Sequence, residues 1–261
     1  MTLPAHIAAG KPAEFGQELL QRRARICRGR VSFSGQRVLD YGCGNGAQTL
    51  LFGCDAATLM GVDISTASIE EFRTHIPPAL TGTVLPVLFD GTVIPAPDAS
   101  FDIVTCFEVL EHVGNEQQTL REITRVLKPH GAFLLTVPNK GWIFETHGAA
   151  LPVLPWNRVP FFSWLPHAIH RKFALARIYR RRDVADLLRA AGFRVEHIGY
   201  VTAPLDVLTI PWLQRLLRRS LFRNDVTSWS ILATAPSILT GLRSGSGTFV
   251  SVAGGHWRYS A

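Results

Sequence analysis

Short apolar runs alternate with longer amphipathic segments along the first half of the chain. The apolar runs are nearly continuous, which is typical of strands buried on both faces of a parallel sheet. They lie at 37–41, 58–64, 83–89, 101–107 and 132–137. Between them, helical spacing of apolar residues is found at 46–53, 66–75 and 115–127. This order predicts an α/β fold with a parallel sheet and helices on both of its faces.

The two ends of the chain carry further patterns. The pattern of residues 14–30 predicts a basic amphipathic helix in which apolar residues, among them Leu19, Leu20 and Ile26, alternate with arginines. Near the other end we expect a helix at 182–191, closed by Gly192, and strands at 193–201 and 228–235. One domain is therefore predicted over residues 1–235. Residues 236–261 are rich in glycine and serine without a clear period, so we expect a loosely ordered tail.

A glycine-rich segment follows the first predicted strand. The sequence VLDYGCGNG at 38–46 leads from apolar residues into glycines at three alternating positions, with Asp40 two residues before the first of them. Glycine permits positive φ and lets a ligand approach the backbone closely. A dinucleotide-binding loop has the spacing G-x-G-x-x-G instead, which disfavours an NAD-linked oxidoreductase.

The next two predicted strands also end in acids. Asp63 closes the second strand, and a carboxylate there suits the hydroxyls of a ribose bound over the glycine loop. Asp90 follows the third strand, where it can accept a hydrogen bond from an adenine amine. Taken singly, Asp63 is also a candidate helix cap and Asp90 a candidate turn residue, although Ser65 is a better cap. Acids at the ends of three consecutive strands are harder to explain by turn chemistry alone.

Residues 37–139 resemble the class I S-adenosylmethionine (SAM)-dependent methyltransferases, most closely the branch with the ubiquinone and menaquinone biosynthesis enzymes. The resembling segments are VLDYGCGNG (38–46), GVDIS (61–65), FDG (89–91), ASFDIVTCFEVLEHV (99–113) and LREITRVLKPHGAFLLTVPN (120–139). The resemblance implies a doubly wound, seven-stranded, mostly parallel Rossmann-like sheet with an antiparallel final hairpin.

The resemblance also implies a SAM site with a role for each part of the motifs. Gly42, Gly44 and Gly46 would surround the methionine part of SAM, and Asp40 would orient its amine. Asp63 would hold the ribose and Asp90 the adenine amine, while Phe107 and Glu108 would line the methyl donor. The expected cofactor set is completed by their neighbours Tyr41, Cys43, Ile64 and Gly91.

Two interpretations of the chemistry stay open at the segment Glu108–His112. His112 is a candidate general base for an acceptor that must lose a proton, because histidine titrates near neutral pH. The same string is also explained as a structural lead into the next helix. A divalent metal held by Glu108, Glu111, His112 and His147 is a further alternative. We expect no metal.

Charge and aromatic content are concentrated in one stretch of the chain. The net charge is +7, and residues 141–223 alone contain thirteen basic and five acidic residues and four of the six tryptophans. In the resembling family, inserts at about 141–181 and 202–227 would form the acceptor pocket. Residues 212–223 have the spacing of an amphipathic helix with a cationic face, which suits either a lid or an anionic membrane surface.

The remaining features limit the classes of protein. We expect no secretory leader and no membrane-spanning helix, since no apolar run reaches the length needed to cross a bilayer, and the four cysteines lack zinc spacing. We expect a cytoplasmic enzyme, peripheral on the membrane, that methylates a small or lipid-like acceptor, mainly at oxygen. An RNA methyltransferase is the second hypothesis, with nucleic acid less favoured as partner. A catalytically silent binding module with this fold is the alternative from another class.

Overall fold

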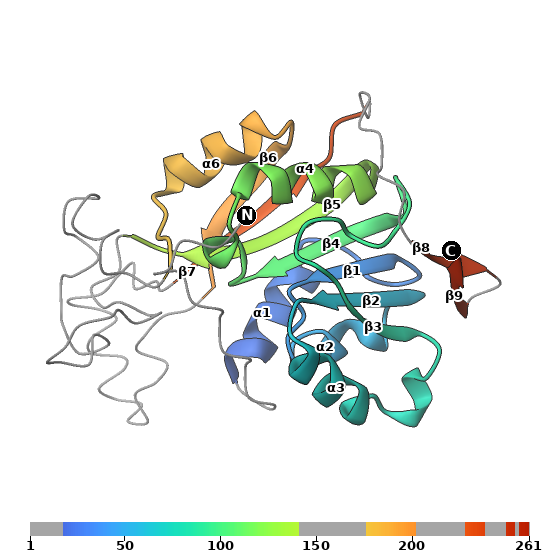
Figure 1. The fold of residues 1–261 in the computed structure, drawn as a ribbon. Helices are drawn as coiled ribbons and strands as arrows, with labels where there is room; N and C mark the ends of the chain where they lie inside the picture. Colours follow the sequence, from blue (N-terminus) through green and yellow to red (C-terminus); the bar gives the residue numbers. More distant parts are fainter. Residues whose placement is uncertain (1–17, 141–175, 202–227, 238–248, 254–255, 261) are drawn as a thin grey trace, which may run out of the picture.

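The structure is a computed structural model that describes residues 18–140, 176–201, 228–237, 249–253 and 256–260. Its centre is a seven-stranded sheet with the order β3-β2-β1-β4-β5-β7-β6 (Figure 1). Strands β1 to β5 are parallel to one another, and β7 is antiparallel to both of its neighbours, β5 and β6. The predicted doubly wound sheet with an antiparallel end is confirmed.

The strands begin and end close to the apolar runs of the sequence. Strand β5 and the pair β8–β9 are the exceptions. The bounds are β1 Arg37–Tyr41, β2 Thr58–Asp63, β3 Val84–Leu88, β4 Phe101–Phe107, β5 Leu127–Pro138, β6 Arg194–Tyr200, β7 Ser228–Thr234, β8 Phe249–Ala253 and β9 His256–Ser260.

Helices cover the sheet on both faces, as Figure 1 shows. One face carries α1 (Glu18–Arg28), α2 (Leu50–Gly53) and α3 (Thr66–His75), and the other carries α4 (Glu116–Val126) and α6 (Arg181–Ala190). Two short 3₁₀ helices, η1 (Pro78–Leu80) and η2 (Leu110–His112), lie in the connections. Within the described ranges, no helix has both the length and the apolarity needed to cross a bilayer.

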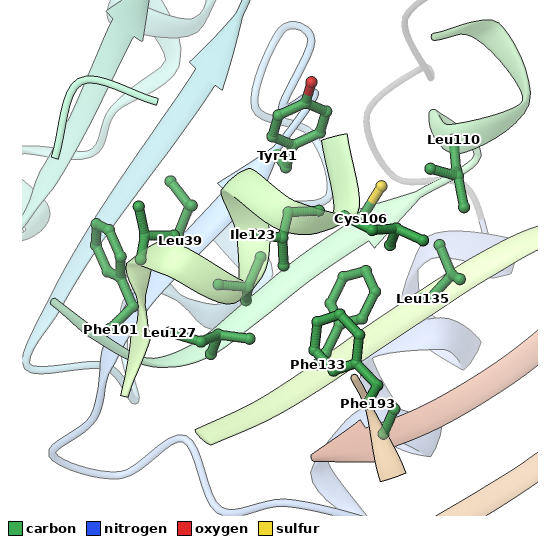
Figure 2. Close-up of a cluster of buried hydrophobic side chains, with 14 of the residues drawn as sticks. Leu39, Tyr41, Phe101, Cys106, Leu110, Ile123, Leu127, Phe133, Leu135 and Phe193 are labelled. Carbon is green, nitrogen blue, oxygen red and sulfur yellow. The ribbon is translucent and has the colours of Figure 1, made fainter. Parts of the chain in front are cut away.

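A separate apolar core forms on each face of the sheet. Figure 2 shows the cluster beneath α4, in which Leu39, Ile123 and Phe133 come from β1, α4 and β5. The cluster on the other face joins α1, α2 and α3 to the same strands through residues such as Phe52 and Phe72. Two-sided burial explains why the central strands are apolar at nearly every position.

Three segments differ from the sequence-based expectation. Helix α2 begins only at Leu50, because glycines with positive φ keep the preceding loop out of the helical conformation. Strand β5 begins at Leu127, directly after α4, and its pairing with β4 skips from Leu127 to Ala132, so that 128–131 bulge out of the ladder. Residues 236–261 include the antiparallel hairpin β8–β9. Most of both predicted inserts lies outside the described residues.

The loop between β3 and β4 is fixed by a buried arginine. Arg125 of α4 is 2% exposed, and its guanidinium donates to the carbonyls of Ile94 and Ala96. It also pairs with Glu122 and Asp98 at 2.9 and 2.8 Å. The charge is therefore satisfied by two carboxylates and two carbonyls, and the chain that follows Asp90 is held against α4.

The glycine loop packs directly on α3. Gly46 has a φ of +82°, and a Cβ added there would lie 2.2 Å from Cδ2 of Phe72. The Phe72 ring is fully buried and has no free space into which it can move. Gly46 is therefore required both by its backbone conformation and by this contact.

We expect Gly46→Ala to destabilise the fold more than Gly35→Ala, its matched control. Gly35 also has a positive φ, +70°, but no atom lies within 4 Å of an added Cβ. Gly35→Ala should cost about 1–2 kcal/mol for the left-handed conformation. Gly46→Ala should cost roughly 1–3 kcal/mol more, because the new methyl group overpacks a rigid core. Urea unfolding of both variants measures the difference, and equal losses would contradict the packing argument.

Candidate functional site

The motifs singled out in the sequence meet at one edge of the sheet. Strands β1 to β4 are mutually parallel neighbours, so their carboxyl ends lie side by side. In doubly wound folds this edge is where ligands bind. The segments that follow these four strands are Gly42–Gly46, Ile64–Ser65, Phe89–Gly91 and Glu108–Val109.

Asp63 connects two of these segments. Its Oδ2 accepts a hydrogen bond from the backbone N–H of Gly44 at 2.8 Å, and its Oδ1 accepts one from Ser65 at 2.9 Å. Ser65 in turn caps α3, because its hydroxyl accepts from the N–H of Ser68. One carboxylate therefore fixes the glycine loop relative to the start of α3. Asp63 is only partly buried, so its oxygens also face the site.

Asp40 lies deeper, beneath the glycine loop. Its side chain is nearly fully buried, and its two oxygens accept hydrogen bonds from Thr49 at 2.5 Å and Thr105 at 2.7 Å. Burial raises the pKa of Asp40, and the two hydroxyl groups partly offset that rise. Asp40 thus joins β1 to β4 and to the residue before α2, and Cys43 beside it in the loop is also buried.

Asp90, Gly91 and Ile64 form the outer part of the edge. Asp90 is exposed, and its carboxylate accepts hydrogen bonds from the N–H groups of Thr92 and Val93 and from the Thr92 hydroxyl. These bonds lower its pKa, so the group stays charged. Ile64 lies against Gly91 and is 53% exposed. An exposed aliphatic side chain close to two carboxylates provides an apolar surface with polar groups at its border.

The rings of Tyr41 and Phe107 are buried in the protein and do not face the ligand edge as exposed side chains. The Tyr41 ring is buried and packs edge-on against Phe89 at a centroid distance of 5.4 Å, so Tyr41 offers its backbone to the edge. Burial raises the pKa of Tyr41. The Phe107 ring is also buried, between Phe52 and the guanidinium of Arg23.

Arg23 is a site residue that the sequence analysis missed. It is 6% exposed and lies over Phe107 at 5.3 Å, with Nη2 3.6 Å from Oε1 of Glu108 and Nη1 3.4 Å from Gln48. Its Nε is buried without a hydrogen-bond partner among the described residues. The missed signal is helical spacing: Arg23 stands three residues after Leu20 and four before Cys27, both buried.

The segment after β4 contains the candidate base. Glu108 begins it with a φ of +56°, an uncommon conformation for a residue with a side chain. Glu111 is fully buried, and burial together with the nearby Glu108 raises its pKa well above the usual range. The raised pKa favours the protonated form of Glu111, which makes it the weaker candidate for a base. His112 in η2 is partly exposed as a residue, but both of its ring nitrogens are buried. The structure brings both residues to the same edge as Asp63.

Residues 176–180, near the end of the first predicted insert, form a strap that hydrogen-bonds to this segment. Arg177 donates its backbone N–H to the carbonyl of Glu111 at 3.2 Å, and its guanidinium donates to the carbonyl of Val113 at 2.5 Å. The Tyr179 hydroxyl donates to Glu116 at 2.6 Å, and the Tyr179 N–H donates to the carbonyl of Pro138. Residues 176–180 therefore bind both β5 and the turn that contains His112.

The described residues contain no group of three or more histidine, cysteine or acidic side chains placed to bind one ion. His147, the fourth ligand of that alternative, lies outside the described residues.

Comparison with known proteins agrees with this geometry. Residues 39–135 match the family model of a methyltransferase domain. A relative described as a probable SAM-dependent methyltransferase, from Mycolicibacterium smegmatis, is 30% identical over 67% of this chain. The chain covers 56% of that relative's length.

A second relative and a solved structure extend the comparison. The ubiquinone biosynthesis O-methyltransferase of Thiobacillus denitrificans is 26% identical over 71% of this chain and 76% of its own length. The crystal structure of a SAM-dependent methyltransferase from Mesorhizobium loti aligns with a TM-score of 0.59 at 18% identity, over 82% of this chain and 99% of that one. With the glycine loop, the acids and the strand order in agreement, the chain belongs to the class I SAM-dependent methyltransferases.

Proposed function

We propose that this protein transfers the methyl group of SAM to an oxygen of a small or lipid-like acceptor. The observation that carries the proposal is the edge formed by β1 to β4. There, the Asp63 carboxylate binds the backbone of the glycine loop and stands next to the exposed Ile64 and Asp90. This arrangement combines a polar partner for the ribose with an apolar surface for the adenine ring.

The described residues fit SAM in charge and in shape. Gly42, Gly44 and Gly46 adopt positive φ and have no side chains, so the loop presents its backbone to a ligand at the strand ends. Beside it, the buried Nε of Arg23 is a donor without a partner among the described residues, and its charge suits the carboxylate of a methionine. We assign the ribose to Asp63 and the adenine amine to Asp90.

The chemistry requires little covalent participation by the protein. When bound, SAM supplies a methyl group already activated by its sulfonium, so the protein's main task is to place the acceptor in line. We assign to His112 the removal of the acceptor's proton, because burial raises the pKa of the neighbouring Glu111 and favours its protonated form. Phe107 and Glu108 at the end of β4 border the reacting centre.

Two observations support the class of acceptor. Transfer to oxygen is supported by the similarity to a ubiquinone biosynthesis O-methyltransferase. A lipid-like acceptor is supported by residues 141–223, where tryptophans and thirteen basic residues are combined in the sequence. We therefore place the enzyme in the cytoplasm, peripheral on an anionic membrane. RNA remains the second candidate acceptor.

Isothermal titration with SAM tests the cofactor assignment. Asp63→Ala should weaken binding at least about tenfold, since a hydrogen bond to a charged acceptor contributes roughly 1.5–3 kcal/mol. Asp55→Ala is the matched control, because Asp55 is an acid paired with Arg28 just before β2, away from the carboxyl edge. Equal affinity in wild type and Asp63→Ala would exclude the ribose assignment. Methyl transfer from labelled SAM to a lipid extract then distinguishes an enzyme from a silent binding module.

A kinetic experiment tests the role of the strap at residues 176–180. Arg177→Met should lower kcat about tenfold to a hundredfold, because small displacements of catalytic groups are costly, while KM for SAM stays near its wild-type value. Arg121→Met, on the exposed side of α4, removes an equal charge as a control. An unchanged kcat in a folded Arg177→Met protein would show that the strap does not position His112.

A further inference from the structure

A basic groove lies between α6 and the edge strand β6. It has a volume of about 430 Å³ and is formed by one side of the helix and by residues 195–198 of the strand. Figure 1 shows α6 lying along β6 at the end of the sheet away from β3. The residues that line the groove are Arg181, Arg182, Ala185 and Arg189 of α6 and Val195, Glu196, His197 and Ile198 of β6.

His197 makes a specific contact at this place with a residue from the opposite part of the chain. Nε2 of His197 lies 2.7 Å from Nη2 of Arg30, which is 167 residues away in the sequence. A guanidinium can only donate, so Nε2 must accept, and His197 is neutral with its proton on Nδ1. The ring lies over Gly199, where an added Cβ would stand 2.6 Å from Nε2. This contact requires glycine at 199.

The positive charges around His197 are not balanced. Arg182 and Arg189 share the single carboxylate of Asp186, and Arg194 pairs with Glu196. Neither Arg30 nor Arg181 has an acidic partner within the described part of the chain. Strand β7, next to β6, contributes the Thr234 hydroxyl as a donor to Glu196 and has no titratable side chain.

The same surroundings set the protonation of His197. Its pKa is lowered by partial burial and by the positive charges of Arg30 and Arg181. The imidazole is therefore neutral at pH 7 in the free protein. A bound anion would reverse the charge effect and would favour the protonated form, so that anion binding and proton binding strengthen each other.

We infer that this groove binds the phosphate group of a ligand through Arg181, which lines it, and through Arg30, which contacts the lining residue His197. As the ligand binds, Arg30 turns from Nε2 of His197 to the anion, and Nε2 takes up a proton. Guanidinium groups match the tetrahedral oxygens of phosphate by paired donors, and two guanidiniums lacking acids supply the opposite charge. The same chemistry exists in a soluble phosphate monoester and in the headgroup of an anionic lipid. The groove is separate from the edge that contains Asp63.

The test measures the pKa of His197 by NMR in sodium sulfate and in sodium chloride at equal ionic strength. Sulfate is a divalent tetrahedral anion that does not titrate near neutral pH, so any shift belongs to the protein. We expect sulfate to raise the pKa of His197 by about one unit, as a close opposite charge does. The double variant Arg30→Gln/Arg181→Gln should abolish this rise.

The control variant Arg73→Gln/Arg121→Gln removes the same charge from exposed positions on α3 and α4 and should keep the sulfate effect. An identical His197 pKa in the two salts would overturn the proposal, and so would an undiminished rise in Arg30→Gln/Arg181→Gln. None of these measurements requires SAM or turnover, so their outcome is independent of the proposed function.

Vesicle co-sedimentation then distinguishes the two sources of phosphate. We compare phosphatidylcholine vesicles with and without phosphatidic acid, using wild type and both double variants. Binding to the acidic vesicles that Arg30→Gln/Arg181→Gln loses and the control keeps would support the site with a lipid headgroup as ligand. A sulfate effect without such vesicle binding would support it with a soluble phosphorylated ligand.

Discussion

The carboxylate of Asp63 is the interaction on which the ligand edge depends. It binds the Gly44 N–H with one oxygen and the Ser65 N–H with the other, and so fixes the loop after β1 to the start of α3. Helix α3 in turn places Phe72 under Gly46. Strand, loop and helix therefore constrain one another, and the site is formed before any ligand arrives, which lowers the ordering cost of binding.

Two arginines from distant parts of the chain fix the opposite side of this edge. Arg23 comes from the helix that precedes the sheet. Arg177 comes from residues 176–180, near the end of the first predicted insert. Both reach the segment after β4, where Arg23 pairs with Glu108 and Arg177 binds backbone carbonyls. The placement of His112 thus depends on elements outside the motifs singled out in the sequence.

The central strands and the glycine loop were predictable because each leaves a local mark in the sequence. Burial on both faces produces continuous apolar runs, and positive φ requires glycine. The burial of Arg23 left a signal in its helical spacing from Leu20 and Cys27, but its contact with Glu108 was not predictable, since that contact depends on how α1 rotates on the sheet. The contact between Arg30 and His197 joins residues that only the completed fold brings together. The hairpin β8–β9 left only a weak signal, because its two alternating runs are short and are separated by paired glycines.

The strand order leaves β3 as one outer strand of the sheet, and its sequence VLPVL has a consequence for association between molecules. The Thr83 carbonyl and the Phe89 N–H both point toward β2, so alternation along the strand directs the backbone of Pro86 outward. Proline has no N–H to offer an incoming strand. The short border at β3 therefore lacks a donor at its midpoint, and the sheet resists extension by a second molecule on that side, which favours solubility at high concentration.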